Sequence, residues 1–358
     1  MNTRIAVATA IGCLAALPLL GLGPEYVGRA AGVQKPTKGP ASFATYIKLP
    51  SLGSNAEANG INDAGTVIVG RSFDRAGLLY AVKWTQQNGT WVISALPAPV
   101  PYPGSAAARG IDNFGNVAGF AASSPRRPVY WPAAGGSSLL GCDSDVGETH
   151  AISANGQIIV GWVVGGQAAA WYSPGSCTEF LPPLEEGGSA TAYAVTGDGN
   201  IIGGRAARGS QQTHVPVRWV VIDGQRQVQQ VDTRPGSVRG ANESGDLAGT
   251  VAIACPAVDG CQRAVIWSAS GAVTQLETLG GQYSSAVDIN AEGEVVGTST
   301  TSRGDFTAYF WSASTGMLQL PAIRGGLAFA LSDVRPDGTR LVVGTSQASA
   351  GVWIVRNP

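Results

Sequence analysis

The side chains best suited to hold a ligand occupy one recurring position of this chain. Seven similar phrases each contain a turn glycine, and the residue six positions before it is a large polar one in several of them. Arginine binds carboxylates and phosphates through paired hydrogen bonds, so a mixed ring of these side chains predicts a site for an anionic or glycan-like ligand. The alternative interpretation is that exposed strand ends vary freely. The position holds Asn59, Arg109, His150, Tyr193 and Arg239, then Val287, and Ser332 in the loosest copy.

The sequence lacks the residue patterns of common catalytic and metal sites. Its two histidines, His150 and His214, fall in different parts of their repeats, and it has no G-x-S-x-G elbow, Walker sequence or dinucleotide fingerprint. Its acidic turn residues lack the alternating oxygen ligands of a calcium loop and are explained as turn formers. We therefore predict no catalytic residue, no cofactor and no metal. The acidic residues are Asp63, Asp112, Asp198, Asp246 and Asp337.

The polar position belongs to a repeat. Each turn glycine is followed 15 to 22 residues later by one tryptophan, which accounts for seven of the nine tryptophans. Successive glycines lie 41 to 50 residues apart, a period typical of stacked supersecondary units. The glycines are Gly65, Gly115, Gly156, Gly199, Gly245, Gly293 and Gly338, and the tryptophans are Trp84, Trp131, Trp171, Trp219, Trp267, Trp311 and Trp353.

Each repeat is predicted to form four short β-strands. Turns such as "NDAG" and "NAEG" are flanked by β-rich runs such as "TVIVG" and "RLVVG". A run ending in the tryptophan follows, and then a fourth run such as "MLQLPAI". Four strands per repeat match one propeller blade, so the sequence predicts an all-β, seven-bladed β-propeller. The tryptophans are expected to fill the core between blades rather than to stack on sugars.

The ends of the repeat region predict how the ring closes. The last repeat stops at "GVWIVRNP", after its third strand, and the run "FATYIKLPSLG" (43–53) precedes the first turn and resembles the fourth strands. We expect this N-terminal strand to pair beside "GVWIVR" and complete the last blade, which leaves no long open edge. An open solenoid is the alternative, and it would not need the strand returned from the opposite end.

The stretch "LETLGGQYSSAVDINAEGEVVGTSTTSRGDFTAYFWSASTGMLQL" (276–320) resembles the HAF-repeat extracellular proteins. It has a leucine-rich run with Gly-Gly, then Ser-x-Ala-x-x-Ile-Asn, then Gly-x-Val-Val-Gly, then an aromatic strand ending in Trp. The resemblance extends over 43–356 with degenerate copies, and "TAYFW" and "RAVIW" have Thr and Arg in place of the family's His. It implies a secreted or envelope-associated repeat protein without an assigned reaction.

The N-terminus predicts export. One Arg precedes an apolar run over 5–23, and small residues follow at Gly28, Ala30 and Ala31, which is a secretory signal pattern. We expect a signal peptide over 1–30, a flexible linker over 31–42 and the propeller over 43–358. Retention of the segment as a membrane anchor and lipidation at Cys13 are the alternatives.

Export would place the remaining cysteines in an oxidising compartment, where disulfides form. Cys255 and Cys261 flank a short loop and are expected to pair. Cys142 and Cys177 would then pair by elimination, although four cysteines allow three connectivities.

Composition limits the partners. Only 13% of residues are charged and the net charge is -1, without the basic stripe that a nucleic acid requires. We therefore expect a monomer that acts as a binding or scaffold module at the cell envelope or outside the cell, with a glycan or a protein as ligand. The alternative is a propeller lyase or hydrolase that acts on an extracellular polysaccharide, which would need an acid and a base in one cavity.

Overall fold

The computed structural model of the protein describes residues 43–99, 105–141, 145–172, 176–209, 212–255, 261–322 and 325–356. Every regular element within these ranges is a β-strand. The same ranges contain no helix long and apolar enough to cross a membrane. The predicted signal peptide and linker, together with Cys13, fall outside the described residues.

In four of the sheets the strands are antiparallel and pair in chain order. Four sheets have four strands each: β2 (Ala56–Ile61), β3 (Val67–Phe73), β4 (Leu79–Gln87) and β5 (Thr90–Ala95); β6 (Ala106–Ile111), β7 (Val117–Ala121), β8 (Arg127–Trp131) and β9 (Ser138–Leu139); β10 (Gly147–Ile152), β11 (Ile159–Val163), β12 (Gln167–Trp171) and β13 (Glu179–Phe180); β14 (Ala190–Val195), β15 (Ile201–Arg208), β16 (Thr213–Ile222) and β17 (Gln225–Gln230).

Two further sheets complete the fold. One has eight strands, in two halves joined by a single parallel pair, Gln262 and Tyr283. Its halves are β18 (Gly236–Ala241), β19 (Leu247–Ile253), β20 (Cys261–Trp267) and β21 (Val273–Gln275), and β22 (Gly280–Ile289), β23 (Val295–Thr301), β24 (Phe306–Ser312) and β25 (Gly316–Gln319). The other has the order β1 (Ala44–Lys48), β28 (Ser349–Arg356), β27 (Thr339–Ser346) and β26 (Gly326–Leu331).

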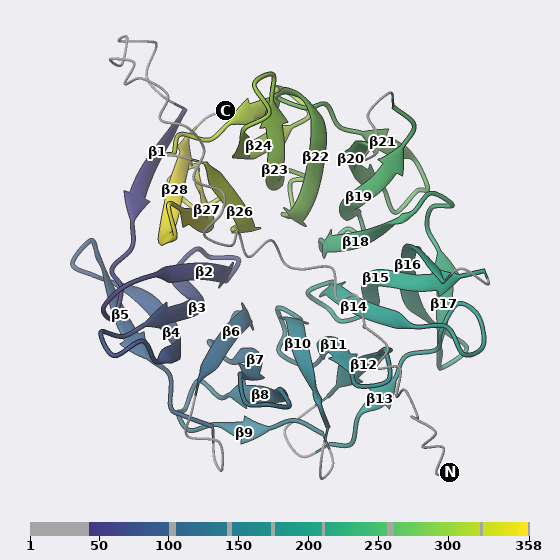
Figure 1. The fold of residues 1–358 in the computed structure, drawn as a ribbon, viewed down its shortest axis with the longest axis horizontal. Helices are drawn as coiled ribbons and strands as arrows, with labels where there is room; N and C mark the ends of the chain where they lie inside the picture. The colour runs from purple at the N-terminus through teal and green to yellow at the C-terminus, as the bar shows by residue number, and fades with distance from the viewer. Residues whose placement is uncertain are drawn as a thin grey trace, which may run out of the picture. The chain divides into compact units, whose positions relative to one another are not determined.

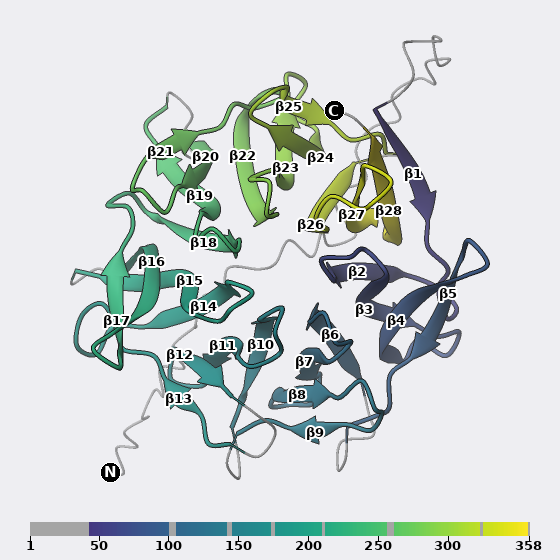
Figure 2. The same cartoon turned by 180° about the vertical axis from the view of Figure 1, so that it is seen from behind.

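The sheets of residues 43–356 are arranged as a ring (Figures 1 and 2). The innermost strands are β2, β6, β10, β14, β18, β22 and β26. The N-terminal strand closes this ring as predicted. β1 pairs antiparallel with β28, with Tyr46 opposite Trp353 and their ring centroids 5.2 Å apart. The outermost strand of this sheet therefore comes from the start of the ring and the other three from its end. An open solenoid does not describe this arrangement.

The hydrophobic core lies between neighbouring sheets. One cluster combines Val82 and Trp84 of the β2–β5 sheet with Val343 and Val352 of the β26–β28 sheet. The repeated tryptophans all lie on the third strand of their groups, and all except Trp311 are buried, which confirms their predicted core role. In the strand of Trp311, the neighbouring Tyr309 and Phe310 are the fully buried side chains.

Four buried indoles also tie their sheet to the one before it through a proline carbonyl. Trp267 does so through the Asp232 carboxylate, whereas Trp171 donates to Thr178, beside β13 of its own sheet. Trp84, Trp131 and Trp219 each donate their Nε1–H to a proline carbonyl at 2.8 Å, and that proline lies two residues after the outermost strand of the preceding sheet. Trp353 makes the same bond to Pro321. The acceptors of the first three are Pro50, Pro97 and Pro182. The leucine-proline pairs at the ends of the outer strands are therefore hydrogen-bonding elements as well as strand ends.

The turns between the first and second strands, here called the inner turns, form a hydrogen-bonded belt. They cover 62–66, 112–116, 153–158, 196–200, 242–246, 290–294 and 332–339, and the predicted turn glycine of each has a positive φ. Asp333 N–H donates to the Asp63 carbonyl at 3.0 Å, and Asn242 Nδ2 donates to the Asn290 carbonyl at 3.0 Å. Such bonds join every neighbouring pair of inner turns except 196–200 and 242–246, between which the described residues form none.

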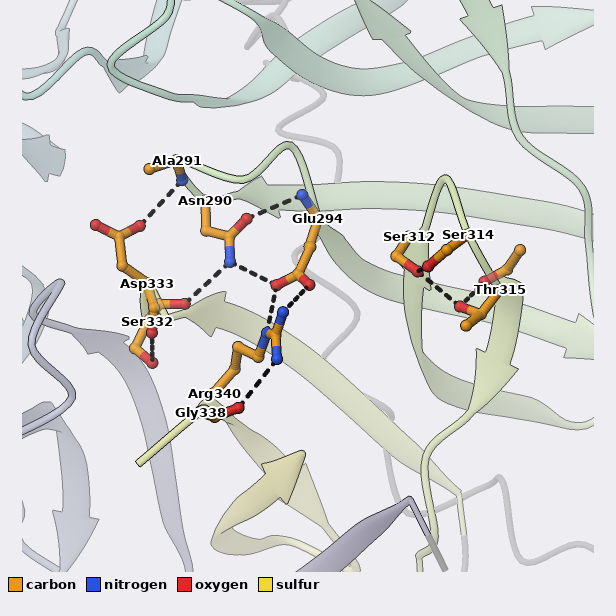
Figure 3. A network of polar contacts seen from close by, with 11 residues as sticks. Asn290, Ala291, Glu294, Ser312, Ser314, Thr315, Ser332, Asp333, Gly338 and Arg340 are labelled. Atoms are coloured by element: carbon orange, nitrogen blue, oxygen red, sulfur yellow. Dashed lines mark hydrogen bonds and ion pairs between the residues drawn. The ribbon is translucent and has the colours of Figure 1, made fainter. Parts of the chain in front are cut away.

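One link of this belt includes a buried ion pair (Figure 3). Asn290 Nδ2 donates to the Ser332 carbonyl and to the Glu294 carboxylate, at 3.3 and 2.8 Å. Glu294 in turn pairs with Arg340 of the next sheet at 2.7 Å. Because both charges are largely buried, each depends on the other for compensation.

A disulfide bond joins Cys255 and Cys261 across the loop between β19 and β20, as predicted. Cys177 is also disulfide-bonded. Its predicted partner, Cys142, lies outside the described residues.

The inner strands approach one another closely around the axis, and one acid interrupts their small residues. A Cβ added to Gly60 would lie 2.7 Å from the Arg109 carbonyl oxygen of the next strand. The corresponding position of β22 is Asp288, whose carboxylate accepts the N–H groups of Ile289 and, across the sheet boundary, Leu331. Burial raises the pKa of Asp288 to about 7 despite these two bonds, and repulsion from Asp63 and Asp333 adds to the rise.

We predict that Trp219→Phe lowers the free energy of unfolding by about 2 kcal/mol. The change removes the indole N–H and leaves the Pro182 carbonyl without its donor, which costs about 1–3 kcal/mol for a buried group. Chemical denaturation measures the loss. Trp311→Phe is the matched control and should cost less than half as much, because Trp311 is only partly buried. Equal losses would contradict a structural role for the indole bond.

A second prediction concerns pH. The folded pKa of Asp288 lies above its unfolded value, so the folded chain holds the extra proton between about pH 4 and pH 7, and stability falls as pH rises through this window. Asp288→Asn should flatten the fall and stabilise the protein at pH 8, because an amide carries no charge to desolvate. Denaturation midpoints measured from pH 4 to 8 test this, and an unchanged slope in the variant would show that Asp288 is not its source.

Candidate functional site

The position singled out in the sequence is a β-bulge in six of the seven inner strands. The pairing with the second strand skips Asn59, Arg109, His150, Tyr193, Arg239 and Val287. A bulge redirects the side chain that it carries, so the sequence comparison identified a real structural position. In the last sheet the bulged residue is Phe329, and the prediction of Ser332 is wrong. The inner turn at 332–339 is longer than the others, which shifts a count made backward from its glycine.

Two of the bulge residues use a hydrogen bond to link sheets. Asn59 Nδ2 donates to the Ala108 carbonyl at 2.8 Å. His150 Nδ1 contacts the equivalent carbonyl of the following inner strand, that of Ala192, also at 2.8 Å. Because a carbonyl only accepts, Nδ1 of His150 carries the proton and Nε2 is unprotonated.

His150 is a neutral imidazole. Its pKa is lowered to about 3, mainly by burial and also by Arg109, Arg239 and Arg205, against the opposite effect of the bond to Ala192. Nε2 forms no hydrogen bond with the described residues. It is therefore an available acceptor.

Tyr193 is contacted from both neighbouring sheets. The His150 ring stacks on it from the preceding sheet, with centroids 4.9 Å apart and planes 21° apart. The Arg239 guanidinium lies 4.0 Å from the ring centroid and comes from the following sheet. Arg205, from the same sheet as Tyr193, lies 5.7 Å from the centroid. We call His150, Tyr193, Arg205 and Arg239 the Tyr193 cluster.

The arginines at the bulges differ in their charge compensation. Arg109 lies 3.9 Å from the Glu148 carboxylate, which also pairs with Arg126, and it interacts electrostatically with Glu57. Arg239 forms no ion pair with any described residue, and its only hydrogen bond there joins Nε to Ser237. Burial lowers the pKa of Arg239, yet an arginine retains its proton. The charge of Arg109 is therefore compensated by carboxylates, whereas the charge of Arg239 is not compensated by any described residue.

Arg205 is the functional residue that the sequence reasoning missed. It lies on β15, it forms no ion pair with described residues, and its buried Nε has no hydrogen-bond partner among them. It also lies near His214, whose pKa is lowered by burial and by Arg205. The signal was present in the sequence: Arg205 directly follows the glycine that ends its phrase, and Arg71 occupies the same place after Gly70.

Three of the acidic turn residues are hydrogen-bonded within their own turns, whereas Asp63 accepts from Asn113 and Asp246 accepts from the Ala269 N–H. Asp112 accepts the N–H groups of Phe114 and Asn116, and Asp198 accepts the Thr196 hydroxyl at 2.6 Å. In the described part of the chain, no group of three or more His, Cys, Asp or Glu side chains is placed to hold a metal ion.

Comparisons with known proteins identify the fold. No family model and no curated protein matches the sequence. The structure is similar to that of YCF48 bound to a D1 peptide, with a TM-score of 0.52, 12% identity and coverage of 89% of this chain and 98% of that one. It is also similar to the β-propeller domain of the Trilobed protease from Pyrococcus furiosus, with a TM-score of 0.51, 10% identity and coverage of 84% and 93%. At these identities the likeness shows a β-propeller fold.

The two histidines provide a direct check on the cluster. We predict that His150 does not titrate between pH 5 and pH 8 and that its Nδ1 bears the proton throughout. Arg205→Gln should raise the pKa of His214, because a nearby positive charge is removed. Nitrogen-15 NMR of the two imidazoles over this pH range measures both. A His150 signal that titrates near pH 6.5 would contradict the buried, neutral assignment.

Proposed function

We propose that the chain is an exported, seven-bladed β-propeller that acts as a binding module and captures an anionic group at the Tyr193 cluster. The observation that carries the proposal is the pair Arg205 and Arg239, two cations at one aromatic ring with no ion-pair partner among the described residues. A buried cation without a counter-ion is costly, and an anionic ligand would compensate it.

The blade count follows if the eight-stranded sheet is taken as two blades. Its halves are joined by only one parallel pair, and each half repeats the four-stranded order of the other sheets. The inner strands β18 and β22 both lie at the centre of the ring (Figure 1). With β1 completing the last blade, this count gives one blade for each tryptophan repeat.

Export and an envelope location are supported by two features. The sequence begins with a signal-like segment, and the chain carries disulfide-bonded cysteines, which persist in oxidising compartments. The resemblance to HAF-repeat extracellular proteins points the same way.

Binding is favoured over hydrolysis by the state of the nearby carboxylates. Glycoside hydrolysis uses a pair of acids, one of them free to donate a proton. The carboxylates that act on Arg109 are Glu57 and Glu148, and each is held in an ion pair, with Arg71 and with Arg126. A module that holds its ligand without cleaving it fits this arrangement better.

The test uses a simple carboxylate. We expect the protein to bind cyclohexanecarboxylate, and the double variant Arg205→Gln, Arg239→Gln to bind it at least tenfold more weakly, since hydrogen bonds to charged groups contribute about 1.5–3 kcal/mol each. NMR titration at low and high salt measures the affinity, which should fall with salt.

The matched control is Arg303→Gln, an exposed arginine in the turn between β23 and β24. It should leave the affinity unchanged. If it weakens binding as much as the double variant does, the interaction is non-specific and the proposed site is wrong.

A further inference from the structure

We infer that the ligand of the Tyr193 cluster is a hydroxycarboxylate, a carboxylate that carries a hydroxyl group close by. This inference rests on the proposed function and narrows its ligand. It follows from three properties of the cluster: the position of its hydrogen-bond donors, the position of its acceptor, and the aromatic surface that is covered and cannot contact a ligand.

The donors are guanidinium groups. The terminal nitrogens of Arg239 form no hydrogen bond with described residues, so they keep their donors for a ligand. Arg205 lies at the same ring and likewise forms no ion pair with described residues. Planar guanidiniums bind carboxylates through two parallel hydrogen bonds, which makes a carboxylate oxygen pair the natural occupant.

The acceptor is Nε2 of His150. Its ring is held by the Nδ1–H bond to Ala192 and by stacking on Tyr193, so the lone pair of Nε2 has a fixed direction. The imidazole stays neutral because Arg109, Arg205 and Arg239 oppose its protonation within a buried setting. Nε2 therefore accepts a hydrogen bond at any physiological pH and repels a bare anion. A ligand hydroxyl satisfies it.

The surface that a ligand cannot contact is the face of the Tyr193 ring. Neutral sugars are commonly held by stacking on an exposed aromatic ring, but here His150 and Arg239 contact the ring from the two neighbouring sheets. The cluster thus recognises polar groups and not an apolar sugar face. Sulfate and fully ionised phosphate supply the anion but no hydroxyl donor, and a neutral sugar supplies the hydroxyl but no anion.

His150 and Arg239 both contact one aromatic ring, so their separation has an upper limit of 8.9 Å, the sum of their two distances to its centre. The centroid of His150 and the guanidinium carbon of Arg239 are 4.9 and 4.0 Å from the same point, the centre of the Tyr193 ring. A uronate sugar residue and a free hydroxy acid both place a hydroxyl within a few bonds of their carboxylate. They share the chemistry that the cluster recognises.

The experiment compares four probes by NMR titration of the full chain: D-glucuronate, lactate, cyclohexanecarboxylate and D-glucose. We expect glucuronate or lactate to bind about fivefold or more tightly than cyclohexanecarboxylate, the gain of one hydrogen bond, and glucose not to bind. The Nε2 resonance of His150 should shift with the hydroxycarboxylates alone. Tighter binding of glucuronate assigns the sugar source, and tighter binding of lactate assigns the free acid.

The variant His150→Asn tests the role of Nε2 as an acceptor separately from the structural role of the His150 side chain. Asn59 makes the equivalent bond from its own inner strand to the next, so asparagine can keep the link to Ala192 while Nε2 is lost. Thermal unfolding checks that the variant is folded. The variant should bind glucuronate and cyclohexanecarboxylate equally, whereas Arg239→Gln should weaken both.

The outcomes are distinguishable. If no carboxylate binds, both the proposed function and this inference are overturned. If carboxylates bind but the hydroxyl gives no gain, or His150→Asn weakens both probes alike, the hydroxycarboxylate assignment is wrong and the anion site stands.

Discussion

The ring depends on one recurring contact, the tryptophan packed between two sheets, whose indole N–H is bonded to the preceding sheet in five of the seven repeats. The ring carbons exclude water from the space between sheets, and the polar edge fixes how the two sheets are placed along each other. Because the acceptor carbonyl follows an outer strand and the indole lies on a third strand, each bond spans the sheet boundary. Without it, sheets that contact mainly through apolar surfaces would have few directional constraints.

Most of this fold could be predicted from the sequence, because short-range patterns within each repeat determine its strands and turns. A glycine with positive φ and a tryptophan at a set distance mark the inner turn and the third strand, and the missing last strand at one terminus required a partner from the other. The count failed only at Ser332, where a longer turn displaced the bulge to Phe329. That displacement depends on how residues 332–339 fold, which a fixed spacing cannot register.

The site was less accessible to sequence reasoning, for a physical reason. Arg109 and Arg239 occupy the same repeat position and look alike in the sequence. Both lie over an aromatic ring, yet only Arg109 has a carboxylate partner among the described residues, Glu148 of the next sheet. Compensation of a charge is decided by residues a whole repeat away, on strands whose neighbours are known only once the ring is assembled. Arg205 was overlooked because it lies on a second strand, where alternation of faces hides its direction.

The site lies next to the one step at which the belt of inner turns has no hydrogen bond between described residues of neighbouring turns. This step falls between turns 196–200 and 242–246, which belong to the sheets that carry Tyr193 and Arg239. At this seam the guanidiniums of two adjacent sheets repel each other where other boundaries are tied by hydrogen bonds. A ligand that bridges the two guanidiniums would link these two sheets where the turns do not. Binding at the site would then also make the ring more rigid.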